Sequence, residues 1–204
     1  NTIIKKMFLK KNLRFFLTIF IFFVYIENSF SIEPSEFIQL TVNRASKALS
    51  NNHTKETKIE KLKVIAKETV DIRGIGFYTL GSHRKNLTDN QKKEYSKLFE
   101  KYFLKSFASR LAEYTDPKIQ VKTQEKLNDN YTIVSSVLIA TDKRPEVKID
   151  WRIYTKNPEK ILIRDLIIEG LSLARTQKEE FNSIIQSNNG NIDSLFDSLK
   201  TFIK

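Results

Sequence analysis

The chain has 204 residues, a formal charge of +11 and no cysteine. Without cysteine no disulfide can form, so the fold must be held together by its core even in an oxidising compartment. A chain of this size can bury enough apolar surface to fold in that way.

The N-terminus has the pattern of a secretory signal peptide. Five basic residues precede an unbroken apolar run from Phe15 to Ile26, and Ser29-Phe30-Ser31 provides small residues at the two positions that a signal peptidase reads. The run of about a dozen residues is shorter than the roughly 20 that a membrane-spanning helix needs, so an uncleaved anchor is the weaker alternative. We therefore predict export and cleavage after Ser31, with Met7 as a candidate translation start.

Cleavage would leave residues 32–204, a length that suits a single domain. It would remove five basic residues and Glu27, and so lower the formal charge from +11 to about +7. A moderately basic exported domain favours anionic lipid surfaces or acidic proteins over nucleic acid as partners. The alternative, that the charge only keeps the protein soluble, fits the composition equally well.

The first half of the mature chain is predicted to be helical. Apolar residues at spacings of three and four indicate helices over residues 34–51, 55–68 and 70–80. Gly74 and Gly76 weaken the third of these and suggest tight backbone packing or a kink. Gly81 then ends this segment as a plausible helix cap.

The longest predicted helix runs from Thr88 to Tyr114, and the rest of the domain is organised around it. Thr88 and Gln91 have the spacing of a capping box, and Asp116-Pro117 closes the far end. Its apolar side chains merge into one wide stripe, which needs a large apolar partner such as the strands that follow. The stripe consists of Tyr95, Leu98, Phe99, Tyr102, Phe103, Phe107, Leu111 and Tyr114. Taken alone, the pattern is that of an ordinary core helix.

Beyond Pro117 the apolar pattern changes from helical to alternating. It predicts strands over residues 119–123, 131–140, 147–154 and 161–168, joined by short turns, and therefore an antiparallel meander. Ser172 then starts a helix that reaches Ile185, and Asn191 caps a final helix to Ile203. Helices followed by strands indicate an α+β fold, with a twisted antiparallel sheet of about four strands packed against the long amphipathic helix and further N- and C-terminal helices.

The residues offer little basis for catalysis. His53 and His83 lie in polar, turn-like surroundings without metal-ligand spacing, and we expect both at the surface. The residues around Ser172 lack the second glycine of a nucleophile elbow, so this serine is better explained as a helix start. No glycine-rich loop has the spacing of a phosphate-binding motif. We therefore expect no enzyme activity, no metal and no cofactor.

Three carboxylates, Asp150, Asp165 and Glu169, could meet near the sheet and act as acid and base. Ion pairs with Arg152 and Arg164 are the simpler use for them. Nucleic-acid binding would need exposed aromatic residues among basic ones, whereas here the aromatic residues share the buried faces and the lysines the opposite faces.

Large apolar residues are the feature of the mature chain that these arguments leave unexplained. A twisted sheet that faces a long helix can close over a solid core or leave a cleft for an apolar ligand. Periodicity does not distinguish between the two.

Four segments together are similar to one known family. They are DIRGIGFYTLG (residues 71–81), LTDNQKKEYSKLFEKYFLKSFASRLAEY (87–114), VKIDWRIY (147–154) and ILIRDLIIEGLSLARTQKEEFNSII (161–185). In this order they resemble the MlaC family of periplasmic phospholipid-binding proteins, also called toluene-tolerance auxiliary proteins. The last segment is the most specific, with Asp165 after a strand and Arg175 before a phenylalanine-bearing helix. The similarity covers about residues 35–204.

The resemblance implies that residues 32–204 form one MlaC-like domain, a monomeric carrier in the periplasm of a Gram-negative envelope. It implies that acyl chains of a phospholipid lie between the sheet and the helices, with the head group near solvent. It also implies lipid exchange with an outer-membrane lipoprotein complex and with an inner-membrane ABC transporter bearing an MCE-domain subunit. Carried over to matching positions, the expected lipid-binding residues are Phe77, Tyr78, Leu80, Phe99, Phe103, Phe107, Trp151, Leu166, Ile168 and Leu171.

Two alternatives stay open. The main one is a periplasmic carrier or chaperone for another apolar cargo, such as a lipoprotein acyl chain or a hydrophobic small molecule. An exported hydrolase that uses Asp165 and Glu169 is more distant, because it requires both carboxylates to converge in a cleft.

Overall fold

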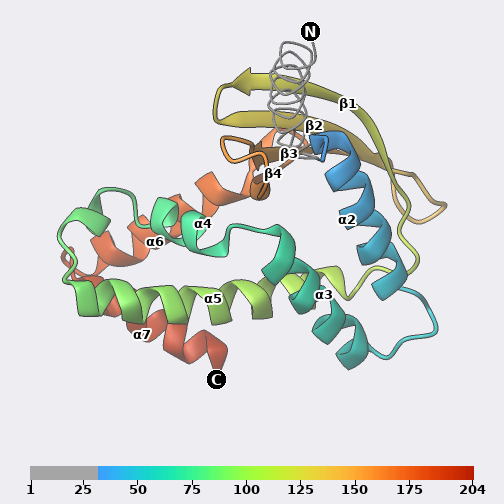
Figure 1. Ribbon diagram of the computed structural model, residues 1–204. Coiled ribbons are helices and arrows are strands. Elements are labelled where there is room, and N and C mark those ends of the chain that lie inside the picture. The colour runs from blue at the N-terminus through green and yellow to red at the C-terminus, as the bar shows by residue number, and fades with distance from the viewer. Residues whose placement is uncertain (1–31) are drawn as a thin grey trace, which may run out of the picture. The chain divides into compact units, whose positions relative to one another are not determined.

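The computed structural model describes residues 32–204, and the predicted signal peptide lies outside the described residues. Within this range helices come first, then the strands of one sheet, then two further helices (Figure 1). In chain order the elements are α2 (Pro34–Ala48), α3 (Lys55–Thr69), α4 (Ile72–Thr79), the 3₁₀ helix η2 (Gly81–Lys85), α5 (Asp89–Leu111), β1 (Ile119–Asn128), β2 (Tyr131–Leu138), β3 (Val147–Tyr154), β4 (Leu162–Ile168), β5 (Leu171–Ser172), α6 (Leu173–Ser187) and α7 (Ile192–Ile203). The predicted α+β fold is confirmed. None of the helices in residues 32–204 is apolar over a length that could cross a membrane.

The sheet is an antiparallel meander in which each strand pairs with its neighbour in sequence. This confirms the predicted connections, and the two-residue strand β5 is an addition that the sequence pattern did not indicate. β1 continues to Asn128, beyond the predicted end at residue 123, because it stays paired with β2 while both of its faces are exposed. Exposure of both faces removes the alternation from which a strand is predicted.

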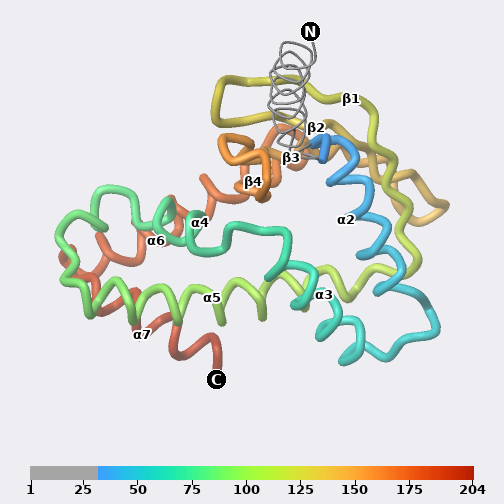
Figure 2. The backbone as a smooth tube through the Cα atoms, viewed as in Figure 1, coloured from blue at the N-terminus to red at the C-terminus, as the bar shows by residue number. Residues whose placement is uncertain are grey.

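The helices form two groups (Figures 1 and 2). In the first group, α5 packs on α4 and α7, and α6 packs on α4 and α7. In the second, α2 and α3 pack on each other, and α2 also lies against β1. Because α5 also contacts α3, this one long helix connects the two groups.

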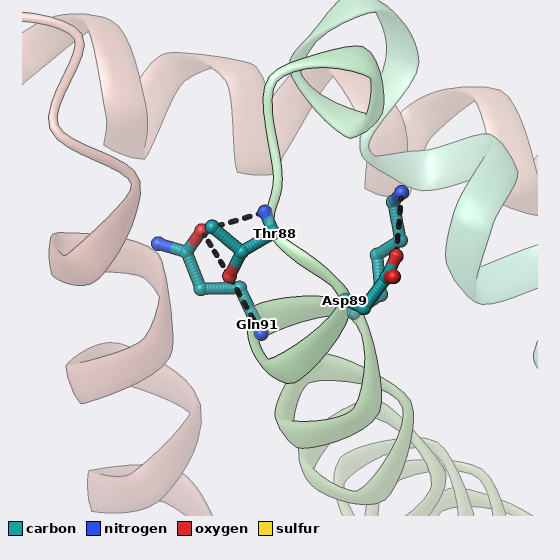
Figure 3. Close-up of polar contacts among 4 residues, drawn as sticks. Thr88, Asp89 and Gln91 are labelled. Carbon is teal, nitrogen blue, oxygen red and sulfur yellow. Dashed lines mark hydrogen bonds and ion pairs between the residues drawn. The ribbon is translucent and has the colours of Figure 1, made fainter.

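Helix α5 begins at the predicted capping box. The Gln91 N–H donates to Thr88 Oγ1 at 3.2 Å, and the Thr88 N–H donates to Gln91 Oε1 at 3.0 Å (Figure 3). These bonds satisfy N–H groups that have no partner inside the helix. The helix ends at Leu111, before the predicted end at Tyr114, whose N–H donates to the Leu111 carbonyl in a turn. The neighbours of α5 are chiefly α3, α4 and α7, rather than the strands that the sequence pattern suggests as its partner.

The group formed by α4, α5, α6 and α7 has a solid aromatic core. Tyr95 is fully buried, its hydroxyl donates to the Gly76 carbonyl at 3.1 Å, and the Thr79 hydroxyl lies 2.9 Å from it. A Cβ atom at Gly76 would lie 2.7 Å from Phe99 Cδ1, so only glycine allows this approach, as the predicted tight packing requires. Ring contacts extend from Tyr95 and Phe99 to Tyr102, Phe103, Phe181 and Phe196.

Candidate functional site

An apolar cavity lies between the inner face of the sheet, helices α2 and α3, and the C-terminal half of α5. The volume that a water-sized sphere can occupy between its walls is ≈ 150 Å³. Binding pockets for small molecules span about 300–1,000 Å³, so the walls of this cavity would have to move apart to take a ligand of that size. It is lined by Thr41, Val42, Ala45, Ser46, Leu49, Leu62, Ile65, Ala66, Thr69, Val70, Phe107, Leu111, Tyr114, Pro117, Ile119, Leu138, Val147, Ile149, Trp151, Ile163, Leu166 and Ile168.

The sheet wall is built from alternate residues of β3 and β4. Ile149 pairs with Ile168, and Trp151 pairs with Leu166. Side chains alternate between the two faces of a strand, so these four side chains point to the same side. The Trp151 indole N–H donates to Ser136 Oγ at 2.8 Å, which fixes the orientation of the ring. The predicted alternation of β3 therefore directs Val147, Ile149 and Trp151 into the cavity and the charged side chains between them to the opposite face.

The helix wall contains small residues. Ala45 and Ser46 on α2 and Ala66 on α3 line the cavity, across from larger side chains such as Phe107. Protein interiors are otherwise close-packed, so larger side chains at these positions would fill part of the space. The residues of α2 and α3 were not among the predicted site residues. A small side chain at a helical position that faces the core is the sequence feature that could have indicated these residues.

Three hydroxyl groups in the lining have their hydrogen bonds inside the protein. The Thr41 and Thr69 hydroxyls each donate at 2.8 Å to the carbonyl four residues earlier in their helix. The Ser46 hydroxyl donates to the Pro117 carbonyl at 2.8 Å. No charged side chain is among the lining residues of the described chain. The cavity therefore suits hydrocarbon, which needs burial and close contacts rather than polar partners.

The exposure of the lining residues shows where the cavity reaches solvent. All four lining residues of α3 are buried, so the cavity is closed on that side. Nine lining residues are half-buried, and four of them lie together just beyond the C-terminal end of α5 and at the adjoining end of the sheet, namely Tyr114, Ile119, Val147 and Ile168; the others are Ala45, Ser46, Phe107, Leu111 and Leu166. We call this end the mouth of the cavity. The loop between β2 and β3 connects two lining residues at this end, Leu138 and Val147.

Four of the ten predicted lipid-binding residues line the cavity, namely Phe107, Trp151, Leu166 and Ile168. They come from three elements that are separate in the sequence, α5, β3 and β4. The structure thus brings these four together around one space, and contact with lipid at these positions stays a prediction.

Four others lie in the helical core or at its edge. Leu80 and Phe99 are buried among the helices, away from the cavity. Phe77 is half-buried against Tyr95, with ring centroids 6.3 Å apart. Phe103 is half-buried and stacks on Phe107, with ring centroids 5.4 Å apart. The stripe on α5 is continuous, but Phe107 lines the cavity whereas Phe103 does not.

The remaining two, Tyr78 and Leu171, are exposed. The Tyr78 ring lies 5.3 Å from the Lys178 ammonium, between α4 and α6. Leu171 is 59% exposed and pairs with Ile168, which places it beside the cavity mouth rather than inside the cavity.

Asp165 has a structural role at the start of α6. It is buried and accepts hydrogen bonds from the Ser172 hydroxyl and from the Ala174 N–H, the latter at 3.0 Å. The predicted ion pair with Arg152 is present, at 3.9 Å. Asp165 neighbours the cavity-lining Leu166 in β4, so its side chain points to the opposite face of the sheet.

The predicted role of Arg164 is wrong in one respect. Its partner is Asp71, at the start of α4, and not one of the three sheet carboxylates. Asp150 instead pairs with Lys148 at 3.2 Å, and Glu169 accepts a hydrogen bond from the Lys148 N–H. The sequence pattern could not show that the start of α4 lies against β4.

The two histidines have ordinary partners. His53 Nδ1 lies 3.0 Å from the Ala48 carbonyl oxygen. His83 Nε2 lies 3.0 Å from Asn182 Oδ1. Among residues 32–204 no group of three or more side chains is arranged to hold a metal ion.

Comparison with known proteins identifies related chains. A family model described as MlaC protein matches residues 39–201. Among solved structures, the fold is similar to that of a phospholipid-binding protein from Ralstonia solanacearum, determined in complex with a phospholipid, with a TM-score of 0.70 and 18% identity over 84% of this chain and 97% of that chain. At this identity the likeness establishes the fold. No curated protein matches the sequence.

Proposed function

The chain belongs to the MlaC family, as its sequence predicted, and on this premise we propose that it is a periplasmic carrier that binds the acyl chains of a phospholipid in the apolar cavity. The observation that carries the proposal is the cavity of ≈ 150 Å³, which is lined mostly by apolar side chains and, within the described chain, by no charged one. The phospholipid in the similar Ralstonia structure supports the same class of ligand.

The energetics of a phospholipid explain why a carrier is needed. Burying a methylene group lowers the free energy by about 0.8 kcal/mol. Exposing two acyl chains of about fifteen methylenes each to water therefore costs roughly 24 kcal/mol. Free diffusion of the lipid between two membranes is therefore negligible. A cavity as apolar as a bilayer interior makes transfer nearly neutral in free energy, so lipid can be loaded and released without a chemical step. Our proposal accordingly involves no catalysis and no cofactor.

Exchange would take place at the two membranes. We propose that the protein acts as a monomer and exchanges lipid with an inner-membrane ABC transporter bearing an MCE-domain subunit and with an outer-membrane lipoprotein complex. The remaining barrier is kinetic, and docking would lower it by widening the mouth of the cavity. Residues 32–204 carry a formal charge of about +7, which would favour approach to anionic head groups and would weaken with salt.

A carrier of another apolar cargo is the second candidate. The cavity lining itself has no group that would distinguish a phospholipid from a lipoprotein acyl chain or a hydrophobic small molecule. Identification of the bound molecule separates these possibilities.

The test is native mass spectrometry of the protein purified from the periplasm of a Gram-negative host. We expect a co-purified mass that organic extraction identifies as phospholipid. Isolation of a lipid-free species alone under gentle conditions would contradict the proposal. Recovery of a different apolar molecule would favour the second candidate.

A further inference from the structure

Arg144 stands at the mouth of the cavity. It lies in the loop between β2 and β3, and its guanidinium carbon is 5.0 Å from the centroid of the Tyr114 ring. Tyr114 is itself one of the half-buried lining residues of the mouth. One aromatic ring thus contacts both the cavity and the guanidinium.

The guanidinium of Arg144 has no anionic partner within the described part of the chain. Three arginines of the described chain have an Nε atom that is enclosed by protein, Arg144, Arg152 and Arg164. Of these, Arg164 faces Asp71 and Arg152 faces Asp165, whereas no ion pair is formed by Arg144 within residues 32–204.

The acidic residues nearest to Arg144 in the sequence do not pair with its guanidinium. Asp142 and Glu146 lie in the same loop, but both are exposed and neither forms an ion pair with Arg144. The loop is held by backbone hydrogen bonds between Thr141 and Arg144 in both directions, at 2.8 and 3.1 Å. The loop backbone is thus held in place and the guanidinium lies against Tyr114, while no hydrogen bond or ion pair among residues 32–204 involves its terminal nitrogens.

We propose that Arg144 binds the phosphate group of the lipid whose acyl chains occupy the cavity. This inference rests on the proposed function. The phosphate of a phospholipid is joined to its chains through glycerol, so chains inside the cavity bring it to the mouth. A planar guanidinium forms two parallel hydrogen bonds with a phosphate, and these charge-assisted bonds are among the stronger ones in proteins. The cavity then selects for hydrocarbon, and Arg144 selects for a phosphodiester next to it.

The test compares two lipids that differ in the phosphate. The mature chain is incubated with vesicles of phosphatidylcholine and diacylglycerol, which have no net charge, and the lipids bound to the re-isolated protein are measured by mass spectrometry. The variants are Arg144→Gln and, as a matched control, Lys143→Gln, which makes the same change in charge at an exposed neighbour without a ring contact. Thermal unfolding of both variants shows whether they remain folded.

We expect the wild-type protein and Lys143→Gln to prefer phosphatidylcholine, and Arg144→Gln to lower that preference about tenfold, the effect of losing one charge-assisted contact. Binding of both lipids with an unchanged ratio in Arg144→Gln would overturn the inference and leave the proposed function standing. Binding of neither lipid by the wild-type protein would overturn the proposed function. If inorganic phosphate raises the unfolding temperature of the wild-type protein but not of Arg144→Gln, while the lipid ratio is the same in both, the site is one for free phosphate and the inference fails.

Discussion

Ala66→Phe is the substitution that tests most directly whether lipid occupies the cavity. Ala66 is 1% exposed, belongs to α3 and lines the closed side of the cavity. A phenylalanine at this position projects its ring into the space that we assign to the acyl chains. The ring therefore competes with the lipid and at the same time fills a void in the lipid-free protein.

The expected magnitudes follow from the added carbon atoms. Phenylalanine has about six more carbon atoms than alanine and would displace a similar number of methylenes, worth about 5 kcal/mol at ~0.8 kcal/mol each. That loss corresponds to more than a thousandfold in lipid affinity. In the lipid-free protein, burial of the ring is worth about 1.5–3 kcal/mol and is offset by a strain of about 1–3 kcal/mol from imperfect packing, so the stability should change little.

The assay measures bound lipid by native mass spectrometry and the stability of the delipidated protein by urea unfolding. The control is Ala174→Phe, because Ala174 is buried on α6 in the helical core and does not line the cavity. We expect the control to destabilise the protein by overpacking, and Ala66→Phe to leave its stability nearly unchanged. Undiminished lipid binding by a folded Ala66→Phe variant would refute the assignment of the cavity to lipid.

Three further predictions concern the rest of the chain. Gly76→Ala should lower the free energy of unfolding in urea by up to about 2 kcal/mol, because the clash with Phe99, about 1–3 kcal/mol, outweighs the ~1 kcal/mol that alanine gains in a helix; a more stable variant would contradict the assigned contact. Burial raises the pKa of Tyr95, so its contribution to stability is complete below about pH 10 and is lost as the pH rises further and the unfolded chain releases this proton. Stability measured from about pH 8 to 11 should therefore fall more steeply in the wild-type protein than in Tyr95→Phe, and equal slopes would exclude this role. The intact mass of the exported protein should correspond to a chain that begins at Ile32, and retention of Asn1 or Met7 would show that no cleavage occurs after Ser31.

Features set by neighbouring residues were predictable from the sequence. The capping box at Thr88 and the helix start at Ser172 each depend on a side chain and an N–H three residues away, and both form. The antiparallel order of the sheet followed from short turns, which leave each strand beside the next. These features can be predicted without knowing which other element packs against the residues concerned.

The extent of the site was not predictable in this way. Phe99 and Phe107 lie on the same stripe of α5, and nothing in the spacing of that stripe distinguishes them. Phe99 packs against the bare backbone of Gly76, whereas Phe107 and Ala66 line the same open space. A periodic pattern shows which face of a helix is buried, but only the partner element determines whether that face meets packed atoms or a void.

The two halves of the domain therefore make different contributions to a carrier. The aromatic core between α4, α5, α6 and α7 is packed without cargo, and it holds the long helix in place. The lining of the cavity lacks contact partners on one side, so its side chains forgo dispersion energy until hydrocarbon fills the space. Binding then stabilises the folded state by mass action. Because α5 belongs to both halves, its N-terminal part keeps the wall formed by Phe107, Leu111 and Tyr114 in position whether or not the cavity is occupied. A carrier needs this property, since it must remain folded in the interval between releasing one lipid and accepting the next.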